Sequence, residues 1–228
     1  MNIEKDSLNT GDFDLFIFDW DGTLAIEPIW RKLNKKLNPL WRIRKAKARR
    51  LTASEAIAEE PKEVERHIYK KGAYESIMRT KTSFEVRSSD LLLLLLEPRL
   101  RAGAKQALSK LSRRGKLVTL VTDGVFYRVY REVEKLGMLE YFEAMLSLQA
   151  INRLKPDPLG AELMLKTLNV KKSRAVYIGD MADDILFAKY AGIKSCAVAG
   201  GFDSYEYLEM HKPDFIFRSM KEFEEHIR

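Results

Sequence analysis

The chain has 228 residues, of which 46% are hydrophobic, and a formal net charge of +7. This is enough for a full core in one large domain, or in one domain with a smaller insert. The first ten residues, MNIEKDSLNT, contain no apolar stretch typical of a signal peptide, and the longest apolar run, 91–96, is too short to cross a bilayer. The only cysteine, Cys196, excludes an internal disulfide, and we expect it to be buried. These features favour a cytoplasmic protein.

Short apolar runs of strand-like composition alternate with helical patterns along most of the chain. The predicted strands cover 13–18, 116–121, 143–148, 174–179, 194–199 and 214–217. Apolar residues three and four apart predict helices over 104–115 and 126–137, which end at Gly115 and Gly137. Strands separated by helices predict a doubly wound α/β fold with a parallel sheet.

Residues 27–99 interrupt this alternation between the first and second predicted strands. They are helix-like and charged, without a clear strand, and Pro28 and Pro98 lie at their ends. They contain 18 Lys or Arg and 10 Asp or Glu, a net charge of +8, whereas the rest of the chain carries 22 against 23. We therefore expect an α/β core over 1–26 and 100–228 with an inserted helical cap over 27–99.

The basic charge of the insert is concentrated in residues 31–50, RKLNKKLNPLWRIRKAKARR. This segment contains ten Lys or Arg and no acidic residue, with apolar residues interleaved. It is typical either of a helix pair with a solvated basic face or of a surface that binds a polyanion or an anionic membrane. No nucleic-acid-binding motif accompanies it, so an anionic partner stays the less favoured alternative.

The stretch FDWDGT, residues 18–23, follows the first predicted strand directly. Asp19 and Asp21 lie two positions apart, so in an extended chain their carboxylates would be on the same side and would repel each other. Something positively charged is expected between them.

Three further polar clusters follow later strands. They are Thr122, Asp123 and Gly124 in LVTDG, then Lys155 in NRLKPDP, and then Asp180, Asp183 and Asp184 in YIGDMADD. Each alone is also typical of a turn, a helix cap or a solvated surface. In a parallel sheet, however, the carboxyl ends of the strands meet at one edge. Several carboxylates, one lysine and backbone N–H groups gathered there predict a site for a divalent metal and a phosphate.

These four clusters resemble, in order, the four motifs of the haloacid dehalogenase superfamily. The matching residues are DWDGT, TD, the lysine before PDP, and GDMADD, and the resemblance covers nearly all of 1–26 and 100–228. The C-terminal part from Ala191 is similar to phosphoglycolate phosphatase-like members. A helical cap occupies the position of the insert in this branch.

The resemblance implies a Mg²⁺-dependent phosphatase that acts on a small phosphorylated metabolite, with 2-phosphoglycolate as the candidate substrate. Asp19 is expected to attack phosphorus and form an aspartyl-phosphate, and Asp21 to transfer protons to and from the leaving group and water. Lys155 and Thr122 would stabilise the phosphoryl group, which lies against Gly22, Thr23, Asp123 and Gly124. The implied metal ligands are Asp19, the backbone carbonyl of Asp21, and Asp180, with Asp184 behind them and Asp183 as the alternative for that position.

Two departures from the family pattern concern the substrate. Asp123 stands where asparagine is common, and Ile26 and Glu27 stand where many phosphoglycolate phosphatase-like members have Asp-Ser. A dehalogenase is disfavoured because those members lack the second aspartate, here Asp21. A phosphomutase of the β-phosphoglucomutase type and a noncatalytic binding protein stay as alternatives.

Overall fold

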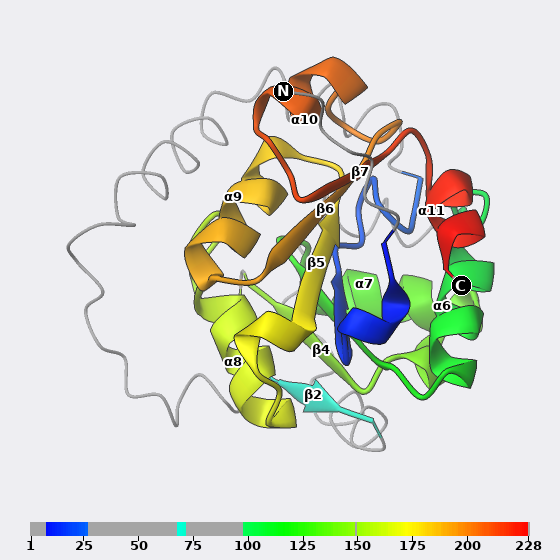
Figure 1. Ribbon diagram of the computed structural model, residues 1–228. Helices are drawn as coiled ribbons and strands as arrows, with labels where there is room; N and C mark the ends of the chain where they lie inside the picture. Colours follow the sequence, from blue (N-terminus) through cyan, green and yellow to red (C-terminus); the bar gives the residue numbers. More distant parts are fainter. Residues whose placement is uncertain (1–7, 27–67, 72–97, 149, 228) are drawn as a thin grey trace, which may run out of the picture.

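The computed structural model describes residues 8–26, 68–71, 98–148 and 150–227 (Figure 1). A seven-stranded sheet forms its centre, and all neighbouring strands are parallel except the first pair at one edge. In spatial order the strands are β2 (Tyr69–Lys70), β4 (Ala144–Ser147), β3 (Leu117–Thr122), β1 (Leu15–Phe18), β5 (Ala175–Gly179), β6 (Lys194–Val198) and β7 (Phe215–Phe217). The predicted α/β fold is confirmed, and each of the six predicted strands is present.

The described helices alternate with the strands along the core. The α-helices are α6 (Ala104–Arg113), α7 (Phe126–Lys135), α8 (Leu159–Leu168), α9 (Ala182–Ala191), α10 (Tyr205–Met210) and α11 (Met220–His226). Short 3₁₀ turns are η1 (Thr10–Asp12), η2 (Leu139–Tyr141) and η3 (Lys172–Arg174). Gly115 and Gly137 follow α6 and α7 with φ of 68° and 61°, the left-handed conformation expected after a helix C-terminus.

Side-chain alternation along the strands gives the sheet two buried faces. Phe16 and Phe18 of β1 join a cluster with residues of α6, α7 and α11, whereas Leu15 and Ile17 join a second cluster with residues of α8 and α9. Figure 1 shows α8 and α9 on one side of the sheet and α6 and α11 on the other. Such double coverage explains why all four residues of β1 are apolar and buried.

Most of the expected insert, including the basic segment 31–50, lies outside the described residues. The inserted helical cap therefore stays a prediction. Residues 68–71 are described, and there Tyr69–Lys70 pairs antiparallel with β4 of the core. This strand was not predicted from the sequence, because two residues are too few to establish a period-two pattern.

Two glycines, one before and one after α6, show how closely the C-terminal helix packs against the core. Gly103 has φ of 86°, and a Cβ there would lie 2.8 Å from Lys221 Cα and 2.9 Å from the Met220 carbonyl oxygen at the start of α11. Gly115 also has positive φ, but no described atom lies within 4 Å of a Cβ at that position. The two glycines thus share the conformational constraint and differ in the steric one.

No described helix is long and apolar enough to cross a membrane.

Gly103→Ala is expected to lower the free energy of unfolding more than Gly115→Ala. Both variants pay roughly 1 kcal/mol for a side chain at positive φ. Gly103→Ala must also displace backbone atoms of α11, an overpacking cost of about 1–3 kcal/mol. Urea unfolding measures both values, and equal destabilisation by the two variants would show that α11 yields without cost.

Candidate active site

The predicted site residues gather at the carboxyl edge of the sheet. β3 and β4 lie on one side of β1, and β5 to β7 lie on the other, so the strand order reverses between β1 and β5. Ligands of open α/β sheets bind in the crevice at such a point. Asp19 directly follows β1 and Asp180 directly follows β5, so both carboxylates flank this crevice.

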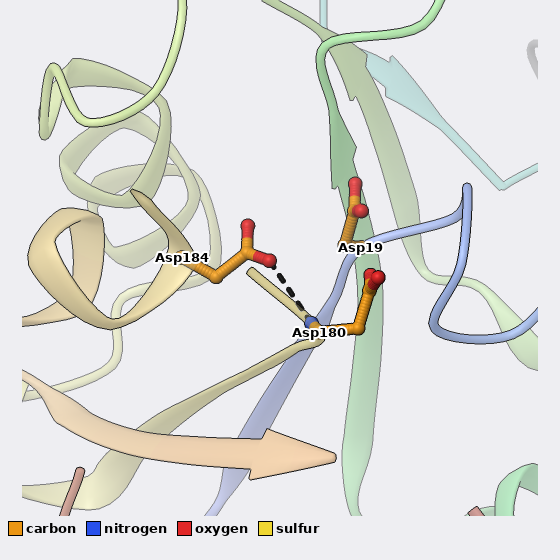
Figure 2. Close-up of side chains that lie close together, drawn as sticks. All are labelled: Asp19, Asp180 and Asp184. Carbon is orange, nitrogen blue, oxygen red and sulfur yellow. Dashed lines mark hydrogen bonds between the residues drawn. The ribbon is translucent and has the colours of Figure 1, made fainter. Parts of the chain in front are cut away.

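Three buried carboxylates lie together there (Figure 2). Asp19, Asp180 and Asp184 each offer an oxygen, and these oxygens lie within 4.8 Å of one another. The three residues are at most 4% exposed. Carboxylate oxygens are the ligands that Mg²⁺ and Ca²⁺ prefer, so the group is suited to a divalent cation. Within the described part of the chain the group contains Asp184 and not its buried neighbour Asp183.

Hydrogen bonds fix the Asp180 carboxylate from two segments. Its Oδ1 accepts a hydrogen bond from the Thr23 hydroxyl at 2.7 Å, and its Oδ2 accepts one from the backbone N–H of Phe202 at 2.6 Å. A Cβ at Gly22 or Gly201 would overlap this carboxylate, and Gly22 has φ of 92°. The hydroxyl of Thr23, which was expected near the phosphate, thus donates its hydrogen bond to Asp180.

Both oxygens of the Asp184 carboxylate have partners within the protein. Its Oδ2 accepts hydrogen bonds from the backbone N–H groups of Asp180, at 3.0 Å, and Met181, at 2.8 Å. Its Oδ1 lies 2.7 Å from Lys155 Nζ. The carboxylate therefore braces the start of α9 and the lysine at the same time.

Lys155 connects two of the three carboxylates. Its Nζ lies 2.9 Å from Asp19 Oδ1 and 2.7 Å from Asp184 Oδ1, and it donates to the Tyr177 hydroxyl at 3.1 Å. Burial alone would lower the pKa of Lys155, but attraction to Asp184 and Asp19 outweighs burial and holds the pKa well above its ordinary value. The ammonium is therefore a permanent positive charge beside Asp19.

Tyr177 was not identified from the sequence. It is fully buried on β5, and its hydroxyl donates to the Val121 carbonyl at 2.9 Å while it accepts from Lys155. Burial raises the pKa of this hydroxyl well above its ordinary value, so the hydroxyl stays neutral. Its ring packs against Phe187 in the core, and an apolar strand pattern gave no reason to assign its oxygen to the site.

The loop after β3 has internal hydrogen bonds that shape it. The Thr122 hydroxyl oxygen accepts from the backbone N–H of Gly124 at 3.0 Å, which leaves the Thr122 proton to be donated elsewhere. Asp123 Oδ1 accepts from the backbone N–H of Lys155 at 3.1 Å. The aspartate that departs from the family pattern thus ties this loop to the segment that carries the lysine.

Asp21, the second aspartate of FDWDGT, pairs with an arginine and not with Lys155. Arg128 on α7 donates from Nη2 to Asp21 Oδ2 at 2.6 Å and from Nη1 to Oδ1 at 3.0 Å. Arg128 also bonds Glu132 one turn later, and Glu132 Oε2 accepts from the Trp20 indole N–H at 2.6 Å. The sequence offered the Arg128–Glu132 spacing typical of a helix pair, but it could not show a contact with Asp21, 107 residues away.

A second arginine joins two loops of the site. Arg101 donates to the Gly22 carbonyl at 2.6 Å and to the Ala199 carbonyl at 2.8 Å. The loop after β1 is thereby held against the loop after β6. Those two loops carry Gly22 and Gly201, which make room for Asp180.

The charge balance of the acidic group is incomplete without a further cation. Burial raises the pKa of Asp19 from 3.8 to about 8, although attraction to Lys155 opposes the rise. Repulsion from Asp184, Asp180 and Asp21 adds to it. Three clustered carboxylates against one ammonium are the chemistry that a divalent cation satisfies, so the residues present fit a metal site.

A model of the haloacid dehalogenase-like hydrolases matches residues 13–192. The chain therefore belongs to the haloacid dehalogenase-like hydrolase family, which confirms the resemblance and the assignment as a hydrolase.

Curated relatives are similar over about half of the chain. Pyrophosphatase PpaX of Halalkalibacterium halodurans is 28% identical over 126 residues, which are 55% of this chain and 58% of that protein. Phosphoglycolate phosphatase of Vibrio parahaemolyticus is 31% identical over 118 residues, which are 52% of each. The chain thus spans less than two thirds of the length of these relatives.

Solved structures share the fold over nearly the whole chain. A predicted phosphoglycolate phosphatase from Haemophilus somnus 129PT has a TM-score of 0.63 at 20% identity and covers 95% of this chain and 99% of its own. CbbY from Rhodobacter sphaeroides, solved in complex with phosphate, has a TM-score of 0.62 at 21% identity, with 92% and 96% covered. At this identity the likeness establishes the α/β fold.

The raised pKa of Asp19 predicts a pH-dependent stability without metal. The folded state holds the Asp19 proton up to about pH 8, whereas the unfolded state releases it near pH 4, so the free energy of unfolding should fall as the pH rises through this window. Each pKa unit corresponds to about 1.4 kcal/mol, so we expect a loss above roughly 1 kcal/mol in EDTA. Mg²⁺ should stabilise the protein more at pH 8 than at pH 5.

Thermal and urea unfolding across pH 4–8 measure this effect. Asp19→Asn is the matched variant, because it removes the titrating group and should flatten its share of the pH dependence. If wild type and Asp19→Asn had the same slope in EDTA, Asp19 would not be the buried acid that the geometry indicates.

Proposed function

We propose that the protein is a Mg²⁺-dependent phosphomonoester hydrolase that acts on a small phosphorylated metabolite through an aspartyl-phosphate at Asp19. The observation that carries the proposal is the buried Asp19 carboxylate, 2.9 Å from Lys155 Nζ and grouped with Asp180 and Asp184 at the strand reversal. Membership of the hydrolase family and the phosphatase names of the relatives support it.

The metal would be held by the carboxylates of Asp19 and Asp180 and by the backbone carbonyl of Asp21. Asp184 would support these ligands from behind, which agrees with the engagement of its oxygens by Lys155 and two backbone N–H groups. A bound Mg²⁺ supplies positive charge to the phosphoryl oxygens. Asp183 stays the alternative for the supporting position on sequence grounds alone.

The proposed reaction has two displacements at phosphorus. An Asp19 oxygen attacks phosphorus and the bond to the ester oxygen breaks. Asp21, which is protonated when the substrate is bound, gives its proton to the leaving alkoxide and becomes a carboxylate. Water then attacks the same phosphorus, Asp21 takes the proton of that water, and the Asp19 carboxylate is released together with phosphate. The protein starts and ends in the same state.

Other residues stabilise the phosphoryl group during both steps. Lys155 offsets negative charge on its oxygens, and Thr122 donates its hydroxyl proton to one of them. Backbone N–H groups near Gly22, Thr23, Asp123 and Gly124 complete the expected surroundings of the phosphate. Gly124 N–H is bonded to Thr122 in this structure, so it would have to exchange that partner for a phosphate oxygen.

Two substrate classes have support. 2-Phosphoglycolate follows from the resemblance and from the name of the Vibrio relative, whereas the name of the Halalkalibacterium relative favours pyrophosphate. Residues 27–99 are expected to select the leaving group, and most of them lie outside the described residues. A phosphomutase of the β-phosphoglucomutase type would use the same core and transfer the phosphoryl group to a sugar instead of water.

A panel of purified substrates distinguishes these possibilities. We expect release of inorganic phosphate from at least one of 2-phosphoglycolate, pyrophosphate and p-nitrophenyl phosphate in Mg²⁺, and none in EDTA. A mutase would instead isomerise a sugar phosphate with little release of phosphate. No turnover of any member would favour the noncatalytic alternative.

Asp19→Asn should abolish phosphoenzyme formation and lower kcat by several orders of magnitude, because the amide is not a nucleophile. Acid-quenched protein after reaction with ³²P-labelled substrate gives the measurement. Asp14→Asn is the matched control. Asp14 directly precedes β1, at the end of the strand away from Asp19, and pairs on the surface with Arg174. Retention of more than about a tenth of wild-type turnover by Asp19→Asn would contradict covalent catalysis through this residue.

A further inference from the structure

The guanidinium of Arg128 grips Asp21 in a fork. Nη1 and Nη2 each donate to a different oxygen of the carboxylate, at 3.0 and 2.6 Å. A paired contact of this kind fixes the plane of the carboxylate as well as its position, which a single hydrogen bond does not. The rotation of the Asp21 side chain is therefore set by α7.

The fork is itself held in place by Glu132 and Trp20. Nη1 of Arg128 lies 2.9 and 2.8 Å from the two Glu132 oxygens, and the Trp20 N–H binds Glu132 Oε2 at 2.6 Å. Trp20 is the residue between Asp19 and Asp21, and it is fully buried. The chain of contacts thus starts and ends in FDWDGT and passes through one turn of α7.

Space for the guanidinium depends on the loop after β3. A Cβ at Gly124 would overlap Arg128 Nη2 and would lie 3.1 Å from Asp21 Oδ2. The glycine of LVTDG therefore permits the fork to reach Asp21. This gives the residue a steric role beside its backbone N–H.

Stability alone is a weak explanation of this arrangement. Arg128 is 1% exposed, and its Nε has no hydrogen-bond partner in the described part of the chain. A buried donor without a partner is destabilising, and buried ion pairs can often be replaced by apolar residues without loss of stability. The fork orients a carboxylate at considerable desolvation cost, next to the residue proposed as nucleophile.

We propose that Arg128 and Glu132 are positioning residues that orient the Asp21 carboxylate for proton transfer to the leaving group and from water. The inference rests on the proposed function, in which Asp21 is the acid and base. Neither residue touches the substrate in this proposal, and both act through the direction in which Asp21 presents its proton.

The leaving group provides a test that a merely structural role would not satisfy. A p-nitrophenolate departs without protonation, whereas an alkoxide needs the proton. We would compare p-nitrophenyl phosphate with the alkyl phosphate that wild type hydrolyses best, and measure phosphoenzyme formation by rapid quench. Arg128→Met should slow the alkyl ester at least about tenfold more than the nitrophenyl ester, within the range that a general acid contributes.

A double-mutant cycle separates orientation from general damage. If Arg128 acts through Asp21, Arg128→Met should add little to Asp21→Asn, because the group that it orients is already gone. Arg128→Lys keeps the charge without the fork and should recover only part of the alkyl rate. Arg131→Met on the same helix is the matched control, since Arg131 pairs with Glu134 on the surface, and it should leave both rates unchanged.

The outcomes distinguish this inference from the proposed function. No turnover by wild type would overturn both. An active wild type with equal losses for the two esters in Arg128→Met, or losses that add fully to those of Asp21→Asn, would overturn the positioning role alone. If circular dichroism shows that Arg128→Met does not fold, Arg128→Lys and Glu132→Gln carry the same comparison, and equal losses for the two esters in both variants would overturn the inference.

Discussion

The contact between Lys155 and Asp19 is the interaction on which the site depends. Three carboxylates lie buried within 4.8 Å of one another, and Lys155 is 2.9 Å from one and 2.7 Å from another. Charges so far from water need partners, and the hydrogen bonds of Thr23, Tyr177 and the start of α9 supply part of them. The raised pKa of Asp19 indicates that one ammonium is not enough.

This concentration of charge constrains the surrounding backbone. Gly22 and Gly201 approach Asp180 so closely that neither can carry a side chain, and Arg101 joins the two loops through their carbonyl groups. Gly124 leaves room for Arg128 in the same way. The glycines thus follow from the packing of charged side chains at the strand ends, and only Gly22 also has positive φ.

The sequence predicted those parts of the fold and site that repeat or carry family motifs. Buried strands such as 175–179 stand out because their residues are apolar, aromatic or small. Asp19, Lys155, Asp180 and Asp184 stand in recognisable motifs after strands. It did not reveal Tyr177, Arg128 or Trp20, because their roles come from contacts with residues far away in the sequence. The same holds for β2, whose two residues pair with a strand more than 70 positions later.

Asp19 pairs with Lys155 and Asp21 pairs with Arg128, and this difference agrees with the roles proposed for the two aspartates. Lysine is a compact charge on a flexible stem, so Asp19 can exchange it for phosphorus during attack while the ammonium moves to the phosphoryl oxygens. Arginine is a planar fork, which suits a carboxylate that must keep its direction through two proton transfers. Arg128 also pairs with Glu132, so its positive charge is shared between two carboxylates and does not act on Asp21 alone. Two carboxylates that would repel each other in isolation are thereby paired with two different cations, Asp19 with Lys155 and Asp21 with Arg128.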